Sequence, residues 1–268
     1  MEYLKKGQIG QDFSNPSQDQ IEPIKAPYQF KFEASAAKLK TLQRSWANNN
    51  VFNWNEFFPD DVADVLHNYY FNKHKDDWDL VVHPDPYFDY GNVGEGNPLT
   101  EEGYYHMFLT KDDDPTLPYR LEFAREAIAN DQFAYVYRRI NDFHPYLRWF
   151  SSEKFIKIVE NLTGFKNLEY IPEYSFVSCY EEGHYNGPHT DGDNGRVAMV
   201  YHLSKDWKPY YGGVFMKTEW GNEVVTKAVN PPFNTLTMFN VVGGAPHFVS
   251  EVVKGVKNKR IAFTAWYV

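Results

Sequence analysis

Cysteine is almost absent from this sequence. Cys179 is the only one among 268 residues, so an internal disulfide framework is excluded and a reducing compartment is expected. We expect Cys179 to serve only as a small side chain packed in a strand.

Long apolar runs are missing as well. No stretch approaches the ~18 apolar residues that a membrane-spanning helix needs, and the first eight residues lack the apolar segment of a signal peptide. The sequence therefore predicts a cytoplasmic protein without a membrane partner.

Positive charge is in the minority. The chain has 27 Lys and Arg against 36 Asp and Glu, a net charge of −9, whereas proteins that bind nucleic-acid phosphates present a basic surface. A nucleic acid is therefore not expected as the main partner.

Apolar and aromatic residues, in contrast, are plentiful. They reach 43% and 18% of the chain, enough for a sizeable core and typical of aromatic-rich strands. Helix signals come first: apolar spacing, an early proline with acids, and capping residues predict helices near 34–46, 57–69, 121–128 and 151–164.

Strand signals dominate the last third. Short β-type runs separated by Gly, Pro and Asn turns suit a barrel or jelly roll. Helices before strands predict an α+β fold, a double-stranded β-helix (jelly roll) with helices packed on one face. We divide the chain into an N-terminal arm and helix (1–50), helical support with a long lid-like loop at 72–119 (51–171), and a jelly-roll catalytic core (172–268).

The most informative motif is His189-Thr190-Asp191. His-x-Asp alone is weak evidence for a metal site, because the chain contains the same motif twice more, in His74-Lys-Asp76 and His83-Pro-Asp85. Those two lie among Asp, Asn, Lys and Pro, where a solvated loop is expected. His189 and Asp191 instead lie between two β-rich runs, so their side chains are expected at the end of a rigid sheet.

A second histidine and a cation follow. In a barrel, strands that are distant in sequence end at the same opening, so His247 can lie beside His189 and Asp191. Taken alone, His247 would be interpreted as a surface or core histidine. Two imidazoles and a carboxylate are a ligand set for non-haem Fe(II). Arg260 lies thirteen residues further on, directly before the apolar run 261–268. If its guanidinium is buried in that strand it requires an anion, which a dicarboxylate such as 2-oxoglutarate would supply. If Arg260 instead lies in a solvated basic turn, it requires none.

These residues belong to a larger pattern. Its segments are Cys179-Tyr180-x-x-Gly183, His189-x-Asp191, 201–207, Gly212-Gly213, Pro232-x-Asn234, His247-x-Val249 and Arg260-x-x-x-Thr264-x-Trp266-Tyr267. The pattern resembles the prolyl 4-hydroxylase group of Fe(II)/2-oxoglutarate dioxygenases, including the oxygen-sensing and ribosomal prolyl hydroxylases. The resemblance covers residues 172 to 268 and, more loosely, the lead-in from about Val51.

The resemblance implies a site. It assigns iron to His189, Asp191 and His247, and the distal carboxylate of 2-oxoglutarate to Arg260. Tyr180 and Thr264 would also contact the co-substrate. This chain departs from the oxygen-sensing relatives at His202, which stands where a tyrosine would hydrogen-bond the co-substrate; a shorter, titratable imidazole could donate the same bond.

The implied reaction consumes O₂ and 2-oxoglutarate, releases succinate and CO₂, and hydroxylates an unactivated C–H bond, with ascorbate as a candidate reductant. The intact Asp191 favours hydroxylation over halogenation, in which a small residue replaces the carboxylate. An alternative of another class is a non-catalytic cupin-like module or a metal-independent binder of sugars or small acids.

The substrate is the least determined feature. Resemblance favours a prolyl residue of a peptide or protein; a free amino acid or small metabolite is the alternative. Trp266 is a candidate wall beside the metal, or simply core. The 72–119 loop, with Tyr87 and Tyr90, is a candidate substrate lid, or an insertion packed on the helices. Its acidic clusters hint at a cationic substrate, and the sequence leaves the oligomeric state open.

Overall fold

The structure is a computed structural model that describes residues 30, 32–84, 109–192, 194–219 and 224–268. Within these residues the α-helices are α1 (Ala36–Asn49), α2 (Asp60–Phe71), α3 (Leu117–Ala129) and α4 (Glu153–Thr163). The strands are β1 (Val51–Asn55), β2 (Asp79–His83), β3 (Leu109–Thr110), β4 (Tyr135–Ile140), β5 (Phe176–Tyr180), β6 (Tyr185–His189), β7 (Val197–His202), β8 (Phe215–Thr218), β9 (Val225–Val229), β10 (Thr235–Asn240), β11 (His247–Val249) and β12 (Arg260–Tyr267). None of the described helices is long and apolar enough to cross a membrane.

The helices begin and end where the capping chemistry predicts. The Ser152 side chain accepts a hydrogen bond from the backbone N–H of Phe155 at the start of α4, and Gly164 closes that helix at φ 81°. Ser35 caps α1 in the same way, and Asn50 ends it in the left-handed region. The sequence placed these helices near 34–46 and 151–164, and the structure has them at 36–49 and 153–163.

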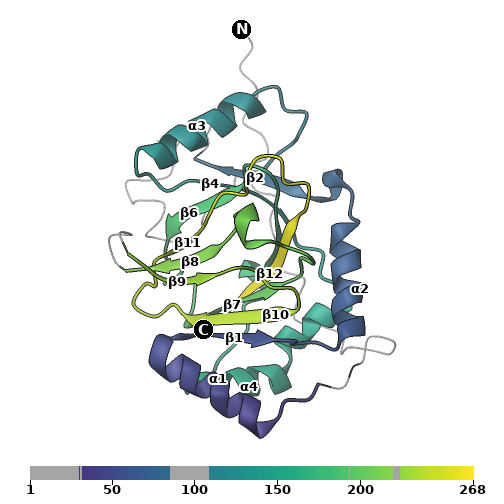
Figure 1. The fold of residues 1–268 in the computed structure, drawn as a ribbon, viewed down its shortest axis with the longest axis vertical. Helices are drawn as coiled ribbons and strands as arrows, with labels where there is room; N and C mark the ends of the chain where they lie inside the picture. The colour runs from purple at the N-terminus through teal and green to yellow at the C-terminus, as the bar shows by residue number, and fades with distance from the viewer. Residues whose placement is uncertain (1–29, 31, 85–108, 193, 220–223) are drawn as a thin grey trace.

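The strands form one strongly curled antiparallel sheet. Its order in the described chain is β1-β10-β7-β12-β5-β4-β6-β11-β8-β9, with β2 paired to β4 and β3. Two strands pair with the same edge of β4. Residues 138–140 of β4 pair with β5, whereas Tyr135 and Val136 pair with β6. The sheet divides there into two facing layers (Figure 1). The expected jelly roll is confirmed.

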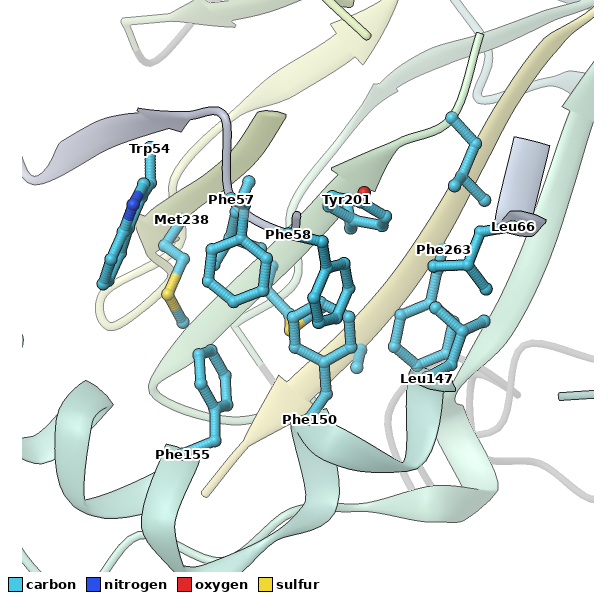
Figure 2. Close-up of a cluster of buried hydrophobic side chains, with 14 of the residues drawn as sticks. Trp54, Phe57, Phe58, Leu66, Leu147, Phe150, Phe155, Tyr201, Met238 and Phe263 are labelled. Atoms are coloured by element: carbon cyan, nitrogen blue, oxygen red, sulfur yellow. The ribbon is translucent and has the colours of Figure 1, made fainter. Parts of the chain in front are cut away.

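Helices cover the outer face of the larger layer. Residues from α1, α2 and α4 share one apolar core with β1, β10, β7, β12 and β5. In Figure 2 the rings of Phe150 and Phe155, from the helical side, point toward Phe57, Phe58 and Tyr201. The Phe57 and Phe150 rings stack at 5.4 Å. Helix α3 packs separately, against β2, β4 and β6.

The opposite face of the larger layer faces the smaller one. Alternation along β12 separates the two sides: Ile261 and Phe263 join the helix-covered core, whereas Trp266 packs between the layers with Phe215 of β8. This enclosed interior, walled by strands on both sides, is where polar side chains could be shielded from water.

The segment 51–171 contains more sheet than expected. It supplies β1, β2, β3 and β4, and the part of the expected loop at 79–83 is a strand paired with β4. β2 is buried at three consecutive residues, so its sequence lacks the period-2 alternation that predicts a half-buried strand. The division into domains stays a prediction, and Tyr87 and Tyr90 lie outside the described residues.

Candidate metal centre

Three side chains converge at the mouth of the interior. β6 ends at His189, Asp191 follows two residues later, and β11 begins at His247 directly opposite His189. One ligand atom from each lies within 4.8 Å of the others. His247 Nε2 is 3.3 Å from Asp191 Oδ2, and His189 Nε2 is 3.6 Å from Asp191 Oδ1. The structure thus brings together the three residues selected in the sequence.

Backbone carbonyls orient both imidazoles. His189 Nδ1 lies 2.8 Å from the carbonyl of Gly187, and His247 Nδ1 lies 2.7 Å from that of Ala245. A carbonyl oxygen only accepts, so each Nδ1 carries the hydrogen and each Nε2 is directed at Asp191. This is the arrangement in which Nε2 of both rings can bind a cation.

Burial sets the charge states around Asp191. Burial and then the neighbouring His247 lower the pKa of His189 to about 4, so this imidazole is neutral at pH 7. Burial alone would raise the pKa of Asp191, but His247, His189 and the Trp266 indole together hold it below its usual value. A buried carboxylate facing imidazole nitrogens is a site that a divalent cation stabilises.

Arg260 is the notable cation of the same interior. It is 2% exposed, and its guanidinium carbon lies 4.9 Å from the centre of the Tyr180 ring on the neighbouring strand. Among the described residues no carboxylate lies within ion-pair distance of it, and its Nε has no hydrogen-bond partner. Burial lowers the pKa of Arg260. A buried guanidinium without an anion fits a site that receives one.

Tyr180 connects Arg260 with the metal-ligand cluster. Burial raises the pKa of its phenol; Tyr137 and Asp191 raise it further, whereas Arg260 opposes them. The phenol is therefore within electrostatic reach of both the cation and the carboxylate. His202, 1% exposed, lies in this interior too: burial and then Arg260 lower its pKa well below the usual value, and its Nδ1 has no partner in the described chain.

Thr264 and Trp266, the two other site candidates in the described residues, both lie on β12. Thr264, half-buried, lies opposite Phe176 and Val200 in the sheet. Trp266 is 6% exposed and packs against Phe176, with ring centres 6.0 Å apart, as a core residue does. Its indole also helps to lower the pKa of Asp191. The individual roles of these residues stay predictions.

The other two His-x-Asp motifs are not part of the cluster. His74 and Asp76 have side chains 78% and 80% exposed, as expected for a solvated loop. For His83 the loop expectation was wrong: it ends β2 and stacks on Tyr135 at 5.0 Å. Asp85 lies outside the described residues.

Sequence reasoning missed a row of rings along β4. The distances that follow join ring centres. The Phe133 ring lies 5.6 Å from that of His189 and 5.3 Å from that of Tyr135. The Tyr137 ring lies 5.5 Å from that of Tyr135 and stacks on the Tyr180 ring at 5.3 Å. Burial raises the pKa of Tyr137 to about 12. This aromatic row runs from the metal-ligand cluster to Arg260; the alternation Phe133-x-Tyr135-x-Tyr137 was the available signal.

Comparison with known proteins identifies the segment that holds the site. Residues 175–268, which include the ligand cluster, His202 and Arg260, match the family model of the 2OG-Fe(II) oxygenase superfamily. This segment is a 2OG-Fe(II) oxygenase domain. The family implies Fe(II), 2-oxoglutarate and O₂, and the His189, Asp191 and His247 cluster fits the metal. No match was found among curated proteins.

Solved structures resemble the chain in fold. An oxidoreductase of the 2OG-Fe(II) oxygenase family from Burkholderia pseudomallei is similar over 89% of this chain and 93% of its own, with a TM-score of 0.51 and 10% identity. This likeness supports the jelly-roll architecture of the 2OG-Fe(II) oxygenase domain.

Two prolyl hydroxylases are more weakly similar. A Pseudomonas putida prolyl-4-hydroxylase has a TM-score of 0.47 at 14% identity and covers 85% of this chain and 97% of its own. A Trichoplax adhaerens prolyl hydroxylase in complex with a hypoxia inducible factor peptide has a TM-score of 0.45 at 16% identity. The match covers 87% of this chain and 93% of that one.

Proposed function

We propose that this oxygenase is a hydroxylase that acts on a prolyl residue of a peptide or protein. The observation that carries the proposal is the joint presence, in one enclosed interior, of the ligand cluster and a buried Arg260 that lacks an anion among the described residues. A 2-oxo dicarboxylate satisfies both requirements at once, because one end chelates a metal and the other is a carboxylate for the guanidinium.

Each residue then has a defined task. His189, Asp191 and His247 would hold the iron, and Arg260 would pair with the distal carboxylate of 2-oxoglutarate, assisted by Tyr180, His202 and Thr264. With both bound, the iron and co-substrate would use O₂ to couple oxidative decarboxylation, which yields succinate and CO₂, to hydroxylation of a C–H bond. The buried setting excludes water, which strengthens the Arg260 contact.

The aromatic row supports a prolyl substrate. A prolyl ring is apolar and has no backbone N–H, so it packs against ring faces without leaving a donor unsatisfied. Phe133, half-buried, is the ring of the row that contacts His189. The motif pattern shared with prolyl 4-hydroxylases favours the same substrate.

Succinate release from Fe(II)-loaded protein tests the reaction. We expect 2-oxoglutarate turnover to be lost in His189→Ala, whereas His74→Ala, which alters an exposed His-x-Asp motif, should retain it. Metal binding, measured by calorimetry with Mn(II), should fall in the first variant only. Absence of turnover in wild type together with unchanged metal affinity in His189→Ala would refute the assignment.

The substrate is tested with proline-containing peptides and free amino acids. Peptides should stimulate succinate release, and mass spectrometry should locate the added oxygen on proline. Phe133→Ala should raise the KM for the peptide while the KM for 2-oxoglutarate stays within about twofold, since this ring lies at the His189 end of the row. Strong turnover on free amino acids and none on any peptide would replace the prolyl substrate with a small metabolite.

A further inference from the structure

Three polar side chains from three neighbouring strands form a hydrogen-bonded chain that ends in the interior. Asn53 of β1 lies opposite Thr237 of β10, and His202 of β7 lies opposite Thr235, two residues along β10. The Thr237 hydroxyl donates to Asn53 Oδ1 at 3.0 Å, and His202 Nε2 lies 3.1 Å from the same hydroxyl oxygen. Thr237 and His202 are each 1% exposed, whereas Asn53 is half-buried on the edge strand.

The direction of these bonds fixes the hydrogen on His202. With the Asn53 amide oxygen toward Thr237, as in this structure, the Thr237 hydroxyl gives its one hydrogen to Asn53. The hydroxyl oxygen then accepts from His202, which places the hydrogen on Nε2. Burial, with Arg260 nearby, keeps the ring neutral. A neutral imidazole has one N–H, so the Nδ1 of His202 is a bare acceptor, and it has no partner in the described chain.

A bare Nδ1 is the wrong partner for a carboxylate. Carboxylate oxygens accept hydrogen bonds and do not donate, so an anion paired with Arg260 would meet a second lone pair at His202. A buried acceptor facing an acceptor costs the bond that a donor would have made. Binding of the dicarboxylate therefore requires the other tautomer, with hydrogen on Nδ1.

We propose that Asn53, Thr237 and His202 form a relay that reverses its hydrogen-bond direction when 2-oxoglutarate binds. The inference rests on the proposed function. In the reversed state His202 Nδ1–H donates to the carboxylate, Nε2 accepts from the Thr237 hydroxyl, and Thr237 accepts from the Asn53 amide nitrogen after the amide turns over. His202 releases its Nε2 proton to water and takes a proton from water at Nδ1, so the three side chains hold the same number of hydrogens in both states.

Asn53 is the residue that permits the reversal. An amide has an accepting oxygen and a donating nitrogen at the same position, whereas a carboxylate only accepts. Its half-buried place on an edge strand leaves room for the amide to turn. An aspartate at position 53 would keep the Thr237 hydroxyl directed at itself and hold His202 Nδ1 bare. Asn53 and Thr237 are thus positioning residues that act through His202.

The first test measures 2-oxoglutarate affinity by calorimetry with Mn(II) and without O₂, so no turnover is needed. Asn53→Asp should weaken binding about tenfold or more, the loss expected for one hydrogen bond to a charged group. Asn55→Asp is the matched control, because Asn55 lies on the same strand, is exposed, and accepts a hydrogen bond at its side-chain oxygen from Thr235 at 3.4 Å instead of from Thr237. It should change the affinity less than twofold.

A double mutant separates the relay from simple charge repulsion. If the effect passes through Thr237, Asn53→Asp should cost no further affinity in the Thr237→Val background, and Asn53→Ala should bind 2-oxoglutarate better than Asn53→Asp. A penalty that persists undiminished in Thr237→Val, or that Asn55→Asp reproduces, would refute the relay.

Histidine tautomers are read directly by ¹⁵N NMR. The His202 signals, assigned by their loss in His202→Gln, should move from Nε2–H to Nδ1–H when 2-oxoglutarate is added with a diamagnetic metal such as Zn(II). This measurement does not depend on whether Asn53→Asp folds. If wild type binds no 2-oxoglutarate, the proposed function fails; if wild type binds and Arg260→Ala does not, yet the His202 tautomer is unchanged, only the relay fails.

Discussion

Two buried arginines show how a single residue can be assigned to stability or to function. Arg138 has a side chain 4% exposed, and it forms ion pairs with Asp112 and with Glu181, the latter at 2.9 Å. Arg260 is buried as deeply but has no acidic partner in the described residues. Because uncompensated buried charge is costly, Arg138 is a structural cation, whereas Arg260 fits the anion site that we propose.

At this scale we predict that Asp112→Asn destabilises the protein by about 1–2 kcal/mol at pH 7, the size of a charged hydrogen bond at a partly exposed site. Burial alone would raise the pKa of Asp112, but hydrogen bonds from Arg138 and Lys75 lower it. Because its pKa is lower in the folded state, the ionised Asp112 stabilises the fold at pH values above the unfolded-state pKa of ~3.9. This stabilisation is lost as the pH falls through the folded-state pKa.

Urea unfolding across pH measures this effect. The gap between wild type and Asp112→Asn should be constant from pH 7 to about pH 5 and shrink below about pH 4. The neighbouring Asp113, which is exposed, provides the control Asp113→Asn, expected to change stability little. A gap that widens at low pH would contradict the assignment.

Among the elements, β6 depends on a close approach to β4. A Cβ on Gly187 would lie 2.6 Å from the Ala134 carbonyl and 2.6 Å from Ile128 Cδ1. The Gly187 N–H donates to that same carbonyl at 2.8 Å, and its own carbonyl accepts from His189 Nδ1. The small residue therefore fixes both the strand pairing and the orientation of the His189 ring.

We predict that Gly187→Ala lowers stability by about 1–3 kcal/mol through overpacking and also weakens Mn(II) binding, because the carbonyl that orients His189 must move. The comparison variant is Gly255→Ala. Gly255 has φ +90° and open space around it, so an alanine there should reduce stability through backbone strain alone. Thermal melts and metal titrations of both variants separate the effects; equal metal affinity in both would show that Gly187 does not orient His189.

The whole molecule couples two sheet layers around one ligand set. His189 and His247 come from the smaller layer, whereas Arg260 and His202 come from the larger one. A ligand that contacts the metal and Arg260 together therefore joins the layers. Such a ligand is expected to stabilise the complete fold, since it binds the native state only.

We predict that 2-oxoglutarate raises the melting temperature only when a divalent metal is present. At about 100 times its Kd the increase should be about 5–10 °C. Differential scanning fluorimetry with Mn(II), with chelator, and with Arg260→Ala as control gives the comparison. Equal stabilisation by 2-oxoglutarate in chelator would indicate a plain anion site at Arg260, the behaviour of a binding module and not of an oxygenase.

The sequence by itself determined the features that depend on neighbouring residues. Capping at Ser152 and Gly164, the strand beside His189-x-Asp191, and the class of ligand chemistry all follow from short patterns, because backbone hydrogen bonds and side-chain types are local properties. The apolar setting of Arg260 likewise indicated burial, and its 2% exposure agrees.

Tertiary structure decided what depends on strand register. Asn53 and Thr237 are 184 residues apart in the chain, yet β1 and β10 place them side by side. The aromatic row needs β4 beside β6 and β5, a pairing that no local pattern specifies. Cross-strand neighbours are fixed by the whole set of pairings, and a shift of one residue would turn each side chain to the other face. The sequence therefore selected the three residues of the ligand cluster, whereas only the folded sheet set their hydrogen-bond partners.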